Sequence, residues 1–228
     1  MDLDSLHSPI GLLFSGGLDS AILLARLLEQ GHVVQPFYVE SGLRWQRDEY
    51  AAGLRYLGEL AQPRLRDLVT LNLPLDDLYG RHWSTTGDWV PDAESREEAV
   101  FLPGRNALLA IKPALWCQMH GLETLAIAPL RDNPFPDASA KFFHQFSSAL
   151  SHGVAATVKL VRPLAHLDKR QVMQLGRHDP LKLTFSCIAP QEGYHCGKCN
   201  KCGERQQAFA LAKIEDPTAY AANLASMP

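Results

Sequence analysis

The sequence predicts an α/β protein built on a doubly wound, mainly parallel sheet. Two observations lead to this prediction: short apolar runs alternate with longer amphipathic stretches, and the first apolar run ends in a glycine-rich turn that enters a helical stretch. Strands that alternate with helices are typical of parallel sheets, since each parallel connection needs a crossover. Four cysteines within residues 187–202 add a small C-terminal segment to the expected fold.

The size and charge of the chain narrow the class of protein. Its 228 residues suit one α/β domain, expected over residues 1–180, followed by a cysteine-rich segment and a C-terminal helix over residues 181–228. A net charge of −3 gives no strong sign of a nucleic-acid partner. No apolar run approaches about 20 residues, and no basic segment precedes an apolar one at the N-terminus, so we expect a cytoplasmic protein without membrane association.

The first strand, Ile10–Phe14, leads through a glycine-rich turn into a helix that begins at about Leu18 and ends near Gly31. Such a turn exposes backbone N–H groups at the positive end of a helix, which predicts a phosphate site. The turn is too short for a Walker A loop and has no lysine, and it lacks the third glycine of a dinucleotide fingerprint. An ordinary turn with an acidic first helical turn remains the alternative. The predicted anion-binding residues are Phe14, Ser15, Gly16, Gly17, Leu18, Asp19 and Ser20.

A second strand is expected over Val33–Val39, where Pro36 indicates an irregular or edge-like strand because proline cannot donate to the ladder. A helix over Arg44–Ala61 and a third strand over Leu68–Leu73 follow. The next stretch, Asp76–Ala99, has no apolar period, so we expect a long functional loop with short helical turns.

A second polar motif, Phe101–Asn106, precedes a helix expected over Ala107–His120. Arg105 stands near the start of that helix, where a guanidinium can meet a phosphate. Cys117, inside the helix, is interpreted as a small buried apolar residue. The buried strand Leu125–Pro129 then feeds the polar loop Arg131–Asp137, and ligands of α/β sheets bind at such carboxyl ends.

The last α/β elements are a helix over Ala138–His152, a strand over Val158–Val161 and a helix over Lys169–Arg177. Asp168 stands directly before the third of these elements, where an aspartate is a good N-cap. A direct functional role for this residue is the alternative interpretation. A polar helix around Glu204–Lys213 ends the predicted series.

The cysteine cluster predicts a metal site. Cys187 is followed after eight residues by Cys196, and two overlapping C-x-x-C steps continue to Cys199 and Cys202. Four thiolates close a tetrahedral zinc site, and a closed site is structural. A redox C-x-x-C pair would leave two thiols unexplained, and an iron–sulfur cluster uses similar ligands, so both alternatives stay open.

Ser15–Ser20 resembles the pyrophosphate loop (PP-loop) of the N-type ATP pyrophosphatase superfamily. Together with three further motifs it resembles the 7-cyano-7-deazaguanine synthase family of queuosine-precursor biosynthesis, over roughly residues 10 to 210. The further motifs are Pro103–Asn106, Pro163–Gly176, and Thr184–Cys187 with the three later cysteines. The resemblance implies an adenine nucleotide alpha hydrolase-like fold, with residues 1–180 as the ATP-binding catalytic domain and residues 181–228 as the zinc-binding segment.

The resemblance also implies an activity. Family members are ATP-dependent carbon–nitrogen ligases that convert 7-carboxy-7-deazaguanine and ammonia into 7-cyano-7-deazaguanine, through an adenylated carboxylate and an amide. ATP, Mg²⁺ and Zn²⁺ are the implied cofactors, the deazapurine carboxylate and ammonia are the small-molecule partners, and a homodimer is the implied assembly.

On this resemblance Ser15–Ser20 hold the phosphates, and Asp19, Arg105 and Lys169 are the catalytic residues. Asn106 contributes to the nucleotide site, and with Asp132 it orients substrate or metal. Asp137 is expected to accept hydrogen bonds from the guanine-like face of the substrate. These assignments carry the roles of the family motifs onto this chain.

Two stretches, Tyr38–Arg44 and Phe135–Ser139, depart from the family pattern, although Pro136 and Asp137 are kept. Two alternatives therefore stay open. One is a PP-loop paralogue that adenylates a different carboxylate, a protein terminus or a tRNA base. The other is a nucleotide-binding regulator without catalysis.

Overall fold

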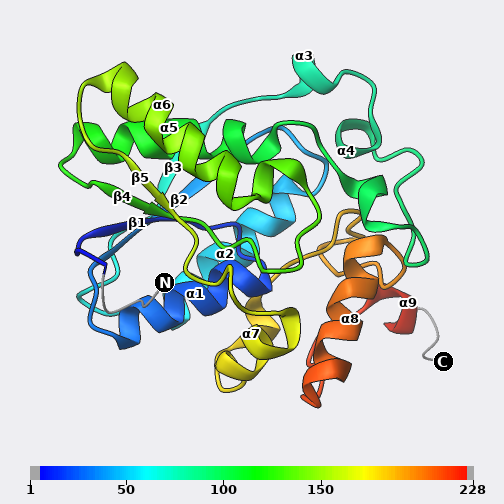
Figure 1. Cartoon of the computed structure of the whole chain (residues 1–228). Coiled ribbons are helices and arrows are strands. Elements are labelled where there is room, and N and C mark those ends of the chain that lie inside the picture. The colour runs from blue at the N-terminus through cyan, green and yellow to red at the C-terminus, as the bar shows by residue number, and fades with distance from the viewer. Residues whose placement is uncertain (1–5, 225–228) are drawn as a thin grey trace.

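The computed structural model describes residues 6–224, which form a five-stranded parallel sheet flanked by helices (Figure 1). The strands run in the order β3-β2-β1-β4-β5, and all four strand pairs are parallel. Their bounds are β1 Ile10–Leu13, β2 Val34–Glu40, β3 Val69–Asn72, β4 Thr124–Ala126 and β5 Lys159–Val161. The order reverses between β1 and β4, so the loop after β1 opens into the crevice where doubly wound sheets bind ligands. The predicted fold class is confirmed.

Two helical layers enclose the sheet. In Figure 1, α5 and α6 cover one face, and α1, α2 and α7 lie on the other. An apolar cluster fills each interface, one between β1 and the layer of α1, α2 and α7, the other between the sheet and the layer of α5 and α6. The helices are α1 Leu18–Glu29, α2 Gln46–Glu59, α3 Asp76–Tyr79, α4 Trp83–Thr86, α5 Arg105–Met119, α6 Ala140–Val154, α7 Lys169–Leu175, α8 Asn200–Ala212 and α9 Ala221–Leu224.

The C-terminal segment packs against the α/β core. Ala208 and Phe209 of α8 belong to the same buried cluster as β1 and α1. A third cluster joins the four cysteines to Trp45 and to Leu102. The division of the chain at residue 180 stays a prediction, and its outer ends, residues 1–5 and 225–228, lie outside the described residues.

Pro36 does not mark an edge strand, so that prediction is wrong. β2 lies inside the sheet, between β1 and β3. The proline is tolerated because pairing with β3 begins one residue later, at Phe37 opposite Val69. Beside the proline, the Gln35 side chain donates to the Asp67 carbonyl at 2.7 Å. A side chain thus supplies a hydrogen bond there that the proline nitrogen cannot give.

Other local predictions are confirmed. The loop from Asp76 holds only short helical turns, as expected. Asp168 caps α7, since its carboxylate accepts from the Gln171 N–H at 2.8 Å. Cys117 is buried, and burial raises the pKa of its thiol to about 12.

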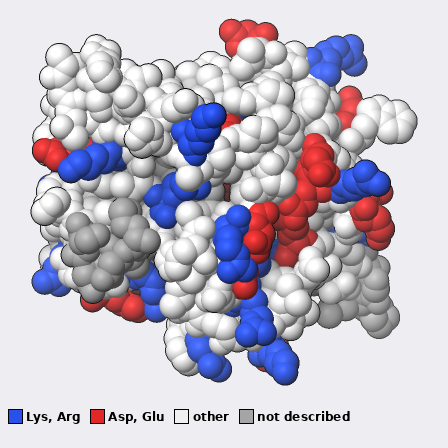
Figure 2. All heavy atoms as spheres, viewed as in Figure 1, with Lys and Arg blue, Asp and Glu red and all other residues white. Residues whose placement is uncertain are grey.

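The surface carries mixed charge. Figure 2 shows Lys and Arg interspersed with Asp and Glu on the face it displays, with no continuous basic surface there. None of the helices within residues 6–224 combines the length and apolarity needed to cross a membrane.

Candidate active site and metal centre

The glycine-rich loop folds tightly at the end of β1. Gly16 has φ +74°, and a methyl group added there would lie 3.2 Å from the Gly53 Cα atom on α2. The loop is also bonded to itself, because Ser15 Oγ lies 3.1 Å from Ser20 Oγ and accepts from the Gly17 N–H at 3.3 Å. Gly17 is the N-cap of α1 and makes no side-chain capping bond, so the start of this helix offers backbone donors to an anion.

An ion pair lies beside this loop. Lys169, the first residue of α7, donates from Nζ to both carboxylate oxygens of Asp19 at 2.7 Å. About a third of each side chain is exposed. The ammonium group therefore stands at the start of α1, where an incoming phosphate would meet it.

The second motif is organised by a buried carboxylate. Gly104, the N-cap of α5, has no side chain, and Asp137 replaces it by accepting from the Asn106 N–H at 2.9 Å. The Asn106 amide also donates to Asp137 Oδ1 at 3.2 Å. Asp137 thus fixes the start of α5, which directs Arg105. The Arg105 guanidinium lies 5.7 Å above the Trp45 ring, and its buried Nε has no hydrogen-bond partner among the described residues.

A cavity of about 320 Å³ joins these groups at the carboxyl ends of β1, β2 and β4. Nine of the residues expected to bind or act on ATP line it: Phe14, Ser15, Gly17, Leu18, Asp19, Ser20, Arg105, Asn106 and Lys169. Gly16 forms the loop behind them. Asp132 lines an adjoining cavity of about 250 Å³ that shares Asp19 and Lys169 with the first. Asp137 lines neither cavity, and its role toward a substrate stays a prediction.

The cavity contains a half-buried acid that the sequence did not single out. Glu49 lines the cavity from α2, and its Oε2 atom accepts from the Tyr38 hydroxyl at 2.8 Å. Burial raises the pKa of Glu49 to about 7, against the opposing effects of Arg105 and of hydrogen bonds from Tyr38 and Trp45. Burial, with the Glu49 carboxylate second, also raises the pKa of Tyr38. The sequence does contain a sign of this position, because a spacing of four residues places Trp45, Glu49 and Gly53 on one face of the helix.

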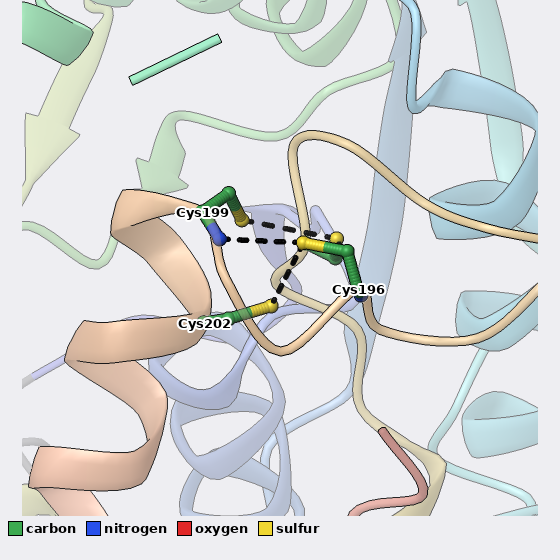
Figure 3. Close-up of side chains that lie close together, drawn as sticks. Cys196, Cys199 and Cys202 are labelled. Carbon is green, nitrogen blue, oxygen red and sulfur yellow. Dashed lines mark hydrogen bonds between the residues drawn. The ribbon is translucent and has the colours of Figure 1, made fainter. Parts of the chain in front are cut away.

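The four predicted metal ligands come together. Cys187, Cys196, Cys199 and Cys202 are buried, and their sulfur atoms all lie within 4.8 Å of one another. The Cys187–Cys199 and Cys196–Cys202 sulfur pairs are each 3.8 Å apart. Figure 3 shows Cys196, Cys199 and Cys202 pointing toward one another from α8 and the turn before it. The cluster is able to hold a metal ion.

Backbone donors surround these sulfur atoms. The Cys196 N–H donates to Cys187 Sγ at 3.3 Å, and the Cys199 N–H to Cys196 Sγ at 3.3 Å. The Gly197 N–H donates to Cys202 Sγ at 3.4 Å. Such donors stabilise thiolates, as the outer-shell partners of a metal site do.

A buried arginine connects the cysteine segment to the glycine-rich loop. Arg205 of α8 is 1 % exposed and donates to Thr184 Oγ1 at 2.9 Å and to the Leu181 carbonyl at 3.0 Å. The adjacent Phe185 N–H donates to the Gly16 carbonyl at 2.8 Å. The position of the glycine-rich loop therefore depends on the C-terminal segment, a connection that the sequence alone did not reveal.

Comparison with known proteins gives a family and a fold. The family model described as "Queuosine biosynthesis protein QueC" matches residues 10–213. The 7-cyano-7-deazaguanine synthase 1 of Desulfitobacterium hafniense (strain Y51) is 30% identical over 205 residues, which are 88% of this chain and 90% of the relative. The 7-cyano-7-deazaguanine synthase of Methanothermobacter thermautotrophicus is 28% identical over 91% of this chain and 97% of the relative.

Among solved structures, the U34-tRNA thiolase NcsA from Methanococcus maripaludis with its [4Fe-4S] cluster is similar at a TM-score of 0.51. The match covers 99% of this chain and 76% of that chain at 15% sequence identity. At this identity the likeness concerns the fold alone.

Proposed function

This chain belongs to the QueC family of queuosine biosynthesis proteins, and on that basis we propose that it is an ATP-dependent 7-cyano-7-deazaguanine synthase. The reaction converts 7-carboxy-7-deazaguanine and ammonia into the 7-cyano product. The observation that carries the proposal is the family match over residues 10–213, because it spans both the glycine-rich loop and the cysteine cluster. Ammonia as nitrogen donor, a homodimeric assembly and a cytoplasmic location complete it.

The chemistry requires activation of a poor electrophile. A carboxylate resists attack by ammonia until one of its oxygens becomes a leaving group, and adenylation by ATP with Mg²⁺ supplies that group as AMP. The first activation leads to an amide, and a second lets the amide oxygen leave so that the nitrile forms. The protein has to hold the phosphates, stabilise the charge that develops on them and keep water away.

The residues that line the cavity suit these tasks. The backbone N–H groups in the first turn of α1, which has no side-chain cap, offer donors to a phosphate, and the Ser20 hydroxyl lines the cavity beside them. Lys169 is held beside them by Asp19, and the Arg105 guanidinium has no acidic partner within ion-pair distance among the described residues. We assign Lys169 and Arg105 to the stabilisation of phosphate charge, and Asp19 to the positioning of Lys169 and the binding of Mg²⁺. Asn106 and Asp132 are assigned to orienting the substrate or the metal.

We assign zinc to the cysteine cluster. A tetrahedral site with Zn–S bonds of about 2.3 Å has sulfur–sulfur edges of about 3.8 Å, and the two cysteine pairs are 3.8 Å apart. A [4Fe–4S] cluster places four irons between its ligands and needs a wider set of thiolates. Zinc held by Cys187, Cys196, Cys199 and Cys202 would be structural, and it would hold the segment that lines the cavity through Ser186 and Ile188.

Mass spectrometry tests the proposal directly. Purified protein is incubated with ATP, Mg²⁺, ammonium and 7-carboxy-7-deazaguanine, and both the nitrile and AMP are followed. We expect the nitrile to form only with ATP and to be lost in Asp19→Ala. AMP without nitrile would indicate a different acceptor, whereas neither product in metal-replete protein would favour a nucleotide-binding regulator.

A further inference from the structure

We propose that Glu49 is the residue that recognises the guanine-like edge of the substrate, by accepting hydrogen bonds from its N1–H and 2-amino groups. The inference rests on the proposed function and deepens it by naming a specificity residue. Three features of Glu49 carry it: its place in the cavity, its hydrogen-bonding capacity and the absence of a direct ion pair among the described residues.

Glu49 is placed to meet a ligand that also reaches the glycine-rich loop. It lines the same cavity as Ser15, Asp19 and Lys169. Its helix packs directly on the loop, since a methyl group on Gly16 would lie 3.4 Å from the Glu49 carbonyl oxygen. A substrate bound at Glu49 would therefore share one cavity with the phosphates that activate it.

The Glu49 carboxylate has capacity for a ligand. An ionised carboxylate accepts about four hydrogen bonds. The Tyr38 hydroxyl takes one position on Oε2 at 2.8 Å and the Trp45 side chain takes another, which fixes the orientation of the group and leaves about two positions for a ligand. Because Glu49 is half-buried and has lost part of its hydration, a ligand that supplies further donors to its carboxylate is favoured over a ligand that does not.

The other acids that line the cavity are already engaged by cations. Lys169 donates to both oxygens of Asp19 at 2.7 Å, and Lys201 pairs with Glu204 at 2.5 Å. Within the part of the chain that the structure describes, Glu49 has no Lys, Arg or His nitrogen within 4.0 Å. Arg105, which lines the same cavity, lowers the pKa of Glu49 through its charge without forming such a pair, so the carboxylate oxygens stay open to neutral donors such as ring and amino N–H groups.

The chemistry of the substrate class matches this acceptor. A 7-deazaguanine keeps the N1–H and 2-amino N–H of guanine, which point in the same direction and fit the two oxygens of one carboxylate. The family resemblance implies this role for Asp137. In the structure both oxygens of Asp137 accept from Asn106, which makes Glu49 the better-placed acceptor.

Binding calorimetry with a matched pair of ligands tests the inference. The probes are 7-carboxy-7-deazaguanine and its analogue without the 2-amino group, 7-carboxy-7-deazahypoxanthine. We expect the wild-type protein to bind the first about 10- to 100-fold more tightly, as one lost hydrogen bond to a charged group implies. Glu49→Gln should reduce this preference to about threefold or less. Asp48→Asn, a neighbouring acid on α2 that does not line the cavity, should keep it.

The outcomes separate this inference from the proposed function. Equal binding of both ligands by the wild-type protein, or loss of the preference in Asp137→Asn and not in Glu49→Gln, overturns the role of Glu49 while leaving the synthase activity intact. No binding or conversion of 7-carboxy-7-deazaguanine by the wild-type protein overturns the proposed function and the inference with it. The wild-type ligand pair decides the matter even if Glu49→Gln fails to fold.

Discussion

Lys169 Nζ lies 2.7 Å from both carboxylate oxygens of Asp19, and this pair joins the first turn of α1 to the first residue of α7. The two residues are 150 positions apart in the chain. The pair keeps the ammonium group beside the glycine-rich loop, at the end of the cavity where we propose that the phosphates bind. Because partly exposed ion pairs contribute little to stability, we interpret its position as functional.

Lys169→Met should therefore impair catalysis far more than folding. We expect kcat to fall by about 10²- to 10³-fold, as for removal of one group that stabilises transition-state charge, with little change in Tm. Steady-state kinetics of AMP release provides the measurement. Arg170→Gln, an exposed cation next to Lys169 on α7, serves as the control and should keep wild-type turnover. A Lys169→Met enzyme with near-normal kcat would exclude the charge role.

Gly16→Ala should weaken ATP binding beyond the cost of backbone strain. The added methyl group lies 3.2 Å from Gly53 Cα and forces the loop away from α2. Gly31→Ala is a matched control, because Gly31 also has positive φ, at +83°, but has no atom within 4 Å of an added Cβ. Backbone strain should cost both variants about 1 kcal/mol of unfolding free energy, and the contact with α2 should add to this cost in Gly16→Ala alone. Only Gly16→Ala should lose ATP affinity in calorimetry, and equal affinities would show that the close contact is irrelevant.

The glycine-rich loop and the cysteine cluster could be predicted from the sequence because the residues of each are close together in the chain. The loop from Ser15 to Ser20 and the cysteines from Cys187 to Cys202 each lie within one short stretch of the chain, so their proximity is visible in the sequence. The five-stranded parallel sheet also followed from the alternation of apolar runs and helices.

Tertiary relationships were not readable in this way. Glu49 and Asp48 are adjacent acids on α2, but only Glu49 lines the cavity. Which of the two side chains points into the cavity depends on how α2 packs against Gly16, and the sequence does not show that packing. In the sequence Arg205 resembles any exposed cation on a polar helix. In the structure it is buried and donates to Thr184 and Leu181. The prediction from Pro36 was wrong because a proline is accepted inside this sheet when pairing with β3 begins after it. The register of β2 and β3 is not visible in the residues around Pro36.

Glu49 should make stability depend on pH. Its pKa is raised from the ordinary 4.5 to about 7 in the folded protein, chiefly by burial. Between these values the folded state binds more protons than the unfolded state, so the stabilising effect of protonated Glu49 is complete below pH 4.5 and is lost as the pH rises through 7. The full loss is on the order of 3 kcal/mol of unfolding free energy.

Glu49→Gln should remove this dependence, since a glutamine stays neutral. Urea unfolding of the wild-type protein and of the variant at pH 5 and pH 8 isolates the contribution of Glu49, because all other titrations are shared. We expect the variant to gain stability relative to the wild-type protein at the higher pH. Asp48→Asn is the control, and a difference that does not change with pH would contradict a raised pKa at Glu49.

The cysteine cluster should hold one zinc ion per chain, and Cys196→Ser should release it. Zinc with four thiolates contributes folding free energy directly, so we expect Tm to fall sharply. Activity should fall as well, because Ser186 and Ile188, the two neighbours of the ligand Cys187 in the chain, line the cavity. Elemental analysis by mass spectrometry, paired with thermal unfolding, measures both effects.

Cys117→Ala provides the control for the metal prediction. Cys117 is buried against Gly11, far along the chain from the cluster, and a methyl group on Gly11 would meet its sulfur. The variant should lose some packing energy yet retain the metal, which separates loss of a thiol from loss of a ligand. Iron with acid-labile sulfide in the wild-type protein would replace the zinc assignment with a cluster, and the absence of any metal would show that the 3.8 Å sulfur spacing forms without one.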